Sequence, residues 1–357
     1  MKKVLLLENG MRFVGESFGS DHDVIAEIVF NTAMNGYLET ITDPGYFGQA
    51  VVQTFPLIGN YGFIPQDLES SAPLLSAYIV RDYCTIPSNF RSRGLLTDFL
   101  ADHNIAGLSG IDTRALTRVL REHGTMNGII TADPDNVDMT VLAAYKVQKA
   151  VESVSAKEIS CHGEGGKYRV VLLDCGVRAN VVKTLTDYGC EVWVCPHDTS
   201  AAKLLSLNPH GIVLSNGPGN PKDNQSIINV VGELQSSRIP IFAYGLGHQL
   251  LALANGFDTC KLKYGHRGAN QPVQDESGKV HITAQNHGYA VLSESVKKDV
   301  AKEIFVNLND KTNEGLLYNN IPAFSVQMQP ESCGGPLNPG MLFERFISMM
   351  EENNAIK

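Results

Sequence analysis

The second half of the chain alternates short apolar runs with segments of helical periodicity. Strands are predicted where the runs are rich in β-branched residues, at 168–174, 191–195, 211–215 and 239–244. Helices are predicted between or after them, at 179–188, 201–207 and 248–254. Apolar strands that alternate with helices build a parallel sheet covered by helices. The pattern therefore predicts an α/β domain with an open, mostly parallel sheet and helices on both faces.

The remaining segments are less regular. The end of the chain adds β-like segments and a helix, at 281–283, 304–308, 323–326 and 341–350. The first 150 residues are richer in Gly, Asn, Thr and Pro, and they contain a β-like run at 24–30. One helix is well signalled there, with a capping box at Ser109–Asp112 and an end before Gly124. This half is predicted to be a separate domain of mixed α/β structure.

A polar, glycine-rich stretch separates the two halves. Residues 161–167 read CHGEGGK and have no apolar periodicity. Domain boundaries fall in segments of this composition. We therefore expect an N-terminal domain over 1–155, a linker over 156–167 and a second domain over 168–357.

Composition and charge exclude several classes of partner. The 357 residues carry a formal charge of −9 and are 43% hydrophobic, as in an ordinary soluble globular protein. Binding of nucleic acid phosphates needs clustered Lys and Arg, which this sequence lacks, so no nucleic acid partner is expected. No apolar run approaches the roughly 18 residues of a membrane span, and Glu8 interrupts the apolar start too early for a signal peptide. We expect no membrane partner and a cytoplasmic location.

The seven cysteines are widely spaced along the chain. They form neither a Cys-x-x-Cys pair nor a His-Cys cluster at zinc spacing. Free, reduced thiols are predicted, and no metal site is expected.

A sharp turn is predicted where the strand at 239–244 meets the following helix. The sequence there is Ala243-Tyr244-Gly245-Leu246-Gly247-His248-Gln249. A strand that ends in small-x-nucleophile-x-small and enters a helix is a nucleophile elbow, and Ala243 and Gly247 are the small flanking residues. The helix N-terminus behind it would supply N–H groups for an oxyanion. Gly245 has no side chain to present, so a plain strand-to-helix turn explains this segment alone equally well.

Three polar loops accompany the turn, each directly after an apolar strand. They read SNGPGNP at 215–221, QNHGY at 285–289 and QMQPE at 327–331. In open α/β sheets, ligands bind at the carboxyl ends of the strands. The loops and the turn together predict a small-molecule site at that edge.

These motifs together resemble those of the small, glutamine-hydrolysing chain of carbamoyl phosphate synthetase. The second half is similar to a class I glutamine amidotransferase, in which the elbow normally reads Gly-Ile-Cys-Leu-Gly-His-Gln. The first half resembles the domain peculiar to the small chain, on three segments: FNTAMNGY at 30–37, TDPGY at 42–46 and IDTRALT at 111–117. The likeness covers nearly the whole chain.

The resemblance assigns a catalytic triad to three positions of this sequence. The nucleophilic cysteine falls on Gly245, the histidine base on Gln329 and the orienting glutamate on Glu331. A carboxamide does not titrate near neutral pH, so Gln329 cannot take a proton from a thiol. Losing the nucleophile or the base alone costs about as much as losing a whole triad. The chain is therefore expected to lack useful glutaminase activity, and Glu331 is expected to be an ordinary loop carboxylate or a helper for Gln329.

The resemblance also assigns glutamine-binding positions, most of which would act through backbone groups. They are Gly45, Gly217, Gly219, Leu246, Gln249, Asn286, Gly288 and Tyr289. Gly45 stands where the family often has serine. Packing of the domain interface is the alternative explanation for these loops.

Three functions remain open at this point. The first is an impaired small subunit that binds the large synthetase chain, so that carbamoyl phosphate for arginine or pyrimidine synthesis is made from free ammonia; this chain then needs no cofactor, and ATP and Mg²⁺ bind to the large chain. The second is a non-catalytic protein that binds glutamine or a related amide. The third is an active glutaminase with an unorthodox nucleophile, for which Cys175 and Cys333 could be considered as nucleophiles and His248 and His287 as bases.

Overall fold

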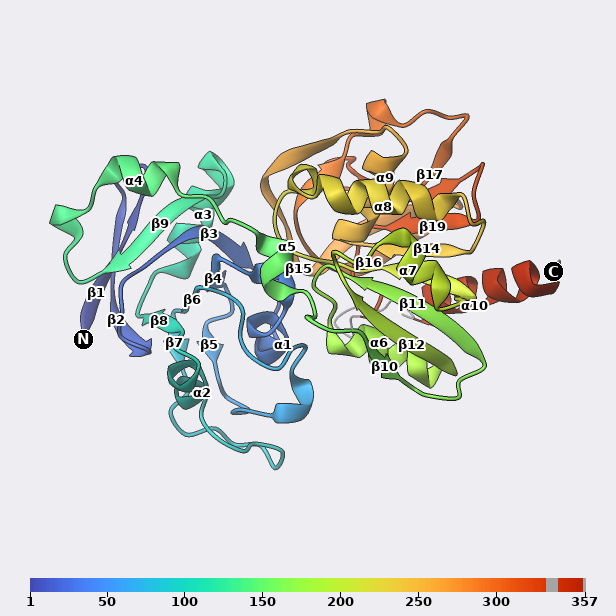
Figure 1. The fold of residues 1–357 in the computed structure, drawn as a ribbon. Helices are drawn as coiled ribbons and strands as arrows, with labels where there is room; N and C mark the ends of the chain where they lie inside the picture. Colours follow the sequence, from blue (N-terminus) through green and yellow to red (C-terminus); the bar gives the residue numbers. More distant parts are fainter. Residues whose placement is uncertain (332–339, 356–357) are drawn as a thin grey trace. The chain divides into compact units, whose positions relative to one another are not determined.

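The computed structural model describes residues 1–331 and 340–355, which form two compact units (Figure 1). The first unit is Met1–Ala150 and the second begins at Val151. This division precedes the predicted linker over 156–167. Ala156 N–H donates to Asp174 of the second unit at 2.7 Å, and Ser160–His162 forms the edge strand β10. The polar segment therefore belongs to the second unit, because edge pairing satisfies its backbone without an apolar run.

The first unit is built around a closed β-barrel. In spatial order its strands are β1 (Lys2–Leu7), β2 (Arg12–Gly19), β8 (Ala106–Ser109), β6 (Ala77–Ile79), β4 (Gln49–Gln53), β3 (Val24–Asn31) and β9 (Met126–Thr131). Closing the sheet leaves no unpaired edge. Two short strands, β5 (Leu57–Ile58) and β7 (Asp82–Tyr83), pair outside the barrel. The prediction of mixed α/β structure is confirmed. The closure of the strands into a barrel was not predicted from the sequence.

Short helices cover the barrel. They are α1 (Tyr37–Ile41), α2 (Leu96–Asp102), α3 (Thr113–His123) and α4 (Met139–Ala144), and α5 (Ala150–Val154) follows at the division. The predicted helix is α3, but it begins later than expected. Asp112 is its N-cap and accepts a hydrogen bond from Ala115 N–H, whereas Ser109 lies in β8.

The second unit contains a ten-stranded sheet. Its central strands run parallel in the order β12 (Cys190–Pro196), β11 (Tyr168–Asp174), β13 (Gly211–Leu214), β14 (Ile241–Tyr244) and β19 (Ala323–Val326). Beyond β19 the sheet continues antiparallel with β18 (Asn313–Tyr318), β17 (Ala301–Asn307), β15 (Thr259–Asp275) and β16 (Val280–Val291). The parallel core agrees with the predicted strands, while β15 and β18 are not predicted.

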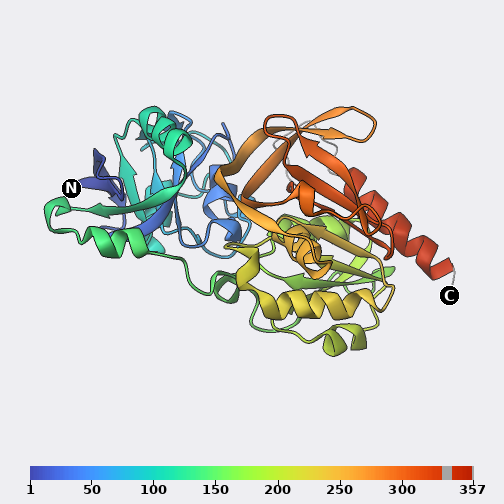
Figure 2. The same cartoon turned by 90° about the horizontal axis from the view of Figure 1, so that it is seen from above.

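Helices cover both faces of the parallel core (Figures 1 and 2). On one face lie α7 (Ala201–Ser206), α8 (Gln225–Gln235) and α9 (Leu246–Ala254). On the other lie α6 (Ala179–Asp187) and α10 (Gly340–Ala355). Successive residues of β11 alternate between the two cores, with Val171 in one and Leu172 in the other. A strand buried on both sides in this way reads as a continuous apolar run.

No helix of the described residues is long and apolar enough to cross a membrane. The described cysteines are all free thiols, and Cys333 lies outside the described residues.

Candidate functional site

The sharp turn predicted at Gly245 is present between β14 and α9. Gly245 has φ 57° and ψ −118°, a conformation that L side chains rarely adopt. Its N–H donates to Val326 O at 3.0 Å, which fixes the turn to the end of β19. The backbone therefore has the strained geometry of a nucleophile elbow, with no side chain to present.

The side chain of Asn216 fills the space next to this turn. Its Oδ1 accepts a hydrogen bond from Leu246 N–H at 3.1 Å, and the residue is 2% exposed. A Cβ added at Gly245 would collide with the same oxygen. One carboxamide thus occupies the space into which a side chain at position 245 would project, and it also engages the N–H of Leu246, a residue that the resemblance assigns to glutamine binding.

The position that the resemblance assigns to the base lies three residues after the end of β19 (329 − 326). Gln329 is half-buried, and its backbone N–H donates to Ala284 O at 3.0 Å. Its carboxamide offers hydrogen-bond donors and an acceptor but no titrating proton. The structure thus places a group at this position that cannot act as a general base.

Glu331 is neither exposed nor free, contrary to the expectation of an ordinary loop carboxylate. Its Oε1 lies 3.0 Å from Nη1 of Arg178, and both side chains are almost completely buried. Arg178 is the N-cap of α6, on the loop that follows β11. A buried carboxylate needs an opposite charge. The arginine provides that charge, so the glutamate has a structural partner that sequence order does not reveal.

The predicted glutamine-binding positions are divided between the two units: Gly45 belongs to the first, and the others lie in loops, in α9 and in β16 of the second. Gly217 packs so closely that a Cβ would collide with the backbone oxygen of Cys175, and Gly219 has φ +88°. Gln249 is buried and donates from Nε2 to Tyr289 O at 2.7 Å and to Gln327 Oε1 at 2.8 Å. The structure therefore joins the helix after the elbow to β16.

Three further predicted positions are placed individually. Asn286 lies on β16 opposite Arg267 of β15, and it is 8% exposed. A Cβ on Gly288 would lie 3.1 Å from Nη2 of Arg267. Gly45 belongs to the first unit, in the short helix η1 (Pro44–Tyr46), where its N–H donates to Asp43 Oδ1 at 2.8 Å.

Neither histidine considered as a replacement base is suited to that role. Burial lowers the pKa of His248 to about 3, and its Nδ1 lies 2.7 Å from Ser325 Oγ. Burial, followed by the nearby His266, lowers the pKa of His287 well below its usual value. A base of such low pKa accepts a proton poorly near neutral pH. Burial also raises the pKa of the Cys175 thiol, which disfavours the thiolate that a nucleophile needs.

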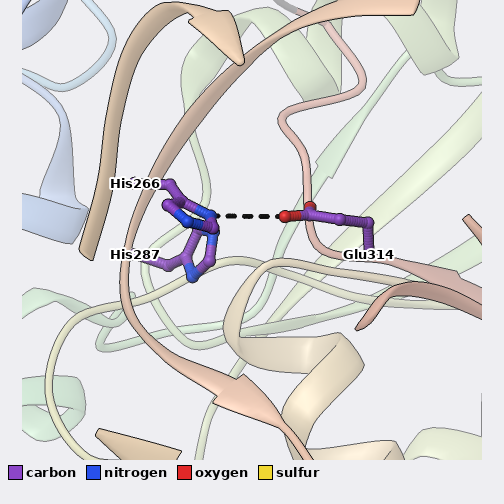
Figure 3. Close-up of side chains that lie close together, drawn as sticks. All are labelled: His266, His287 and Glu314. Atoms are coloured by element: carbon purple, nitrogen blue, oxygen red, sulfur yellow. Dashed lines mark ion pairs between the residues drawn. The ribbon is translucent and has the colours of Figure 1, made fainter. Parts of the chain in front are cut away.

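Sequence reasoning missed a buried charged cluster behind this site (Figure 3). Its members are His266, His287 and Glu314, whose ligating atoms all lie within 4.8 Å of one another. Two imidazoles and a carboxylate are a common ligand set for divalent metals. It is the one such group found within residues 1–331 and 340–355. Their spacing of 21 and 27 residues along the chain fits no short motif (287 − 266 and 314 − 287).

Charge balance in the cluster does not require a metal ion. His266 Nε2 lies 2.9 Å from Asp310 Oδ2, and its Nδ1 lies 3.3 Å from Glu314 Oε1. Burial alone would lower the pKa of His266, but the hydrogen bonds to these two carboxylates outweigh it and raise the pKa to about 9. An imidazolium between two carboxylates supplies the positive charge that a cation would otherwise bring. The absence of a metal site stays a prediction.

The cluster is linked to the predicted glutamine-binding residues. Gln285 Nε2 donates to Glu314 Oε2 at 2.8 Å, and Gln285 Oε1 lies 3.0 Å from His287 Nε2. His287 Nδ1 lies 2.8 Å from Tyr289 O, the same oxygen that Gln249 contacts. The network therefore supports residues 285–289, which lie within the strand β16 and do not form the loop predicted from the sequence.

Comparison with known proteins agrees with both halves of this architecture. Residues 5–130 match the family model "Carbamoyl-phosphate synthase small chain, CPSase domain", and residues 171–349 match "Glutamine amidotransferase class-I". The carbamoyl phosphate synthase small chain of Listeria monocytogenes serotype 4b is 44% identical over 98% of this chain and 97% of that protein. The chain belongs to the carbamoyl phosphate synthase small-chain family.

Other members of the carbamoyl phosphate synthase small-chain family give the same result. The small chain of Syntrophotalea carbinolica is 44% identical over 99% of both chains. The pyrimidine-specific small chain of Halalkalibacterium halodurans is 45% identical over 99% of this chain and 98% of that protein. The family assignment therefore covers both units.

Proposed function

We propose that this chain is the small subunit of a carbamoyl phosphate synthase that takes its nitrogen from free ammonia. Membership of the small-chain family supports the assignment as a subunit, and the name 'small chain' implies a large chain as its partner. The observation that carries the ammonia dependence is the position of Asn216. Its Oδ1 lies where a nucleophile at Gly245 would project and bonds the N–H of Leu246.

Release of ammonia from glutamine, before water cleaves the resulting thioester, would need three events at this site. A thiolate must attack the amide carbon, the oxyanion must be stabilised, and a base must return a proton to the departing ammonia. Gly245 offers no thiol, Asn216 occupies the Leu246 N–H, and Gln329 cannot carry the proton. Each of the three events lacks the chemical group that it needs, so this chain cannot release ammonia from glutamine.

The remaining role is to complete the enzyme. We expect ATP and Mg²⁺ to bind to the large chain, which would make carbamoyl phosphate from bicarbonate, ammonia and ATP. A glutamine-sensing function is less well supported, since a glutamine amide would have to displace Asn216 from Leu246 N–H. An unorthodox nucleophile is also less well supported, because Cys175 is buried and the pKa values of His248 and His287 are lowered.

The test is carbamoyl phosphate synthesis by the purified complex of this chain with the large chain of the same organism. Ammonium chloride should support synthesis, whereas glutamine should support a rate at least about a thousandfold lower. The isolated small chain should release no glutamate from glutamine. Glutamine-driven synthesis at a rate similar to that with ammonium would overturn the proposal.

A gain-of-function variant sharpens the test. Gly245→Cys with Gln329→His restores the two lost side chains but leaves Asn216 and the Arg178–Glu331 pair in place. We expect little recovery of glutaminase activity from this double variant. The further change Asn216→Gly should raise the activity, because it opens the space beside the introduced thiol.

A further inference from the structure

One loop of the first unit exposes two large apolar side chains. The loop connects β7 to α2 over residues 84–95 and is named the 84–95 loop here. Phe90 is 92% exposed and Ile86 is 85% exposed, more than any other large apolar side chain in the described residues. Burying a side chain of this size is worth roughly 1.5–3 kcal/mol. Burial of these two side chains against a partner would therefore contribute to the free energy of binding.

The 84–95 loop is held in place by backbone hydrogen bonds to the neighbouring segment. Ser88 N–H donates to Asn60 O at 3.0 Å, and Arg93 N–H donates to Phe63 O at 2.7 Å. Phe63 N–H donates in return to Gly94 O at 2.9 Å. A loop that is ordered before binding loses less entropy on association. Phe90 thus lies on a loop whose backbone is already ordered in the free chain.

The charge of the loop differs from that of the whole chain. Residues 84–95 contain Arg91 and Arg93 and no acidic residue, although the chain carries a net charge of −9. Arg91 pairs with Asp67, whereas Arg93 is exposed. Aromatic and arginine side chains are enriched where interfaces bind most strongly. A complementary surface would be an apolar pocket with carboxylates at its rim.

The position of the loop in the sequence indicates its partner. The loop lies within residues 5–130, which match the small-chain domain and not the amidotransferase domain. This domain is peculiar to small chains, which have the large chain as their partner. An exposed surface of the domain is therefore expected to contact the large chain. Resting on the proposed function, we infer that the 84–95 loop docks onto the large chain, with Phe90 inserted into an apolar pocket and Arg93 facing acidic side chains.

The test measures the affinity of the full-length chain for the large chain by calorimetry. Phe90→Ser should raise Kd about tenfold or more, and Ile86→Ser should raise it by a smaller factor. Arg93→Glu should also raise Kd and should reverse part of the salt dependence. The matched control is Val141→Ser, which removes an apolar side chain that is 56% exposed on α4 of the same unit, and it should leave Kd unchanged. All these side chains are exposed, so circular dichroism should show unaltered folding.

The outcomes separate this inference from the proposed function. If the wild-type chain binds the large chain and Phe90→Ser binds equally well, the docking role of the loop is wrong while the subunit assignment stands. If the wild-type chain does not bind, the subunit assignment itself fails, and the docking role fails with it. If light scattering shows a dimer of this chain that Phe90→Ser dissociates, with the affinity for the large chain unchanged, the loop joins two copies instead.

Discussion

The side-chain oxygen of Asn216 lies in the space that a side chain on Gly245 would occupy. The same oxygen accepts the Leu246 N–H, so Asn216 caps the start of α9 from outside the helix. Free N–H groups at a helix start are stabilised by such an acceptor. The glycine and the asparagine therefore form one arrangement, and changing either affects the other.

Substituting Gly245 should reveal this coupling. Gly245→Cys should lower the free energy of unfolding by about 1–3 kcal/mol, because the residue has positive φ and its Cβ meets Asn216. Combined with Asn216→Ala, the loss should be smaller than the sum of the two single losses. Urea denaturation of the four proteins in the cycle measures the difference.

Gly256 provides the matched control for that cycle. It also has positive φ, +77°, but a Cβ there would have no atom within 4 Å. Gly256→Cys should be destabilising through the backbone alone and should be additive with Asn216→Ala. Equal coupling at both glycines would contradict the steric explanation.

Removing one member of the Arg178–Glu331 pair should be strongly destabilising. Arg178→Met should lower the free energy of unfolding by about 3–5 kcal/mol, because Glu331 is left charged and buried. Lys183→Met is the control, since it breaks the exposed Lys183–Asp187 pair on α6 and should cost less than about 1 kcal/mol. Similar losses for the two variants in urea denaturation would show that the buried pair does not stabilise the fold.

Stability should depend on pH through His266. Its pKa is raised to about 9 from the ordinary 6.5, so its contribution is complete below about pH 6.5 and is lost as pH rises through 9. That contribution is on the order of 1–3 kcal/mol. Denaturation midpoints between pH 6 and 10, measured with a chelator present, should fall more steeply for wild type than for His266→Gln. Parallel curves would contradict the imidazolium assignment.

His248 should stay neutral over the whole physiological range. Burial lowers its pKa to about 3, so the nitrogen chemical shifts of this ring should not change between pH 5 and 8. Selective ¹⁵N labelling of histidine, with His248→Gln to assign the signal, measures this. A titration midpoint above pH 5 would return His248 to the set of possible bases.

The buried parallel strands were the most predictable part of the fold. The predicted strands at 168–174 and 323–326 match β11 and β19, because residues that are buried on both faces leave a continuous apolar run. The strand β15 was missed because its residues Thr259–Asp275 are largely polar and only partly buried. Its register comes from pairing with β16, a contact that no local pattern encodes.

The candidate site also has some features that could be predicted from the sequence and others that could not. The turn at Gly245 could be predicted from its motif, since it follows directly on the recognisable strand β14, and the assignment of catalytic positions to Gly245 and Gln329 stays a prediction. The place of the Asn216 side chain and the partner of Glu331 could not be predicted, because they depend on loops that are far apart in sequence and meet only in the folded sheet. The sequence thus predicted which groups the site lacks, and the structure showed which side chains surround those positions.

The Arg178–Glu331 pair has a consequence for how this chain could change over evolutionary time. Arg178 follows β11 and Glu331 follows β19, and the strands that carry Asn216 and Gly245 lie between those two in the sheet. A histidine introduced at position 329 would find its orienting glutamate already bound to arginine. A cysteine introduced at position 245 would meet an asparagine. We therefore expect that glutamine hydrolysis could not be installed by single substitutions, because each introduced side chain would meet a neighbour that is already engaged elsewhere.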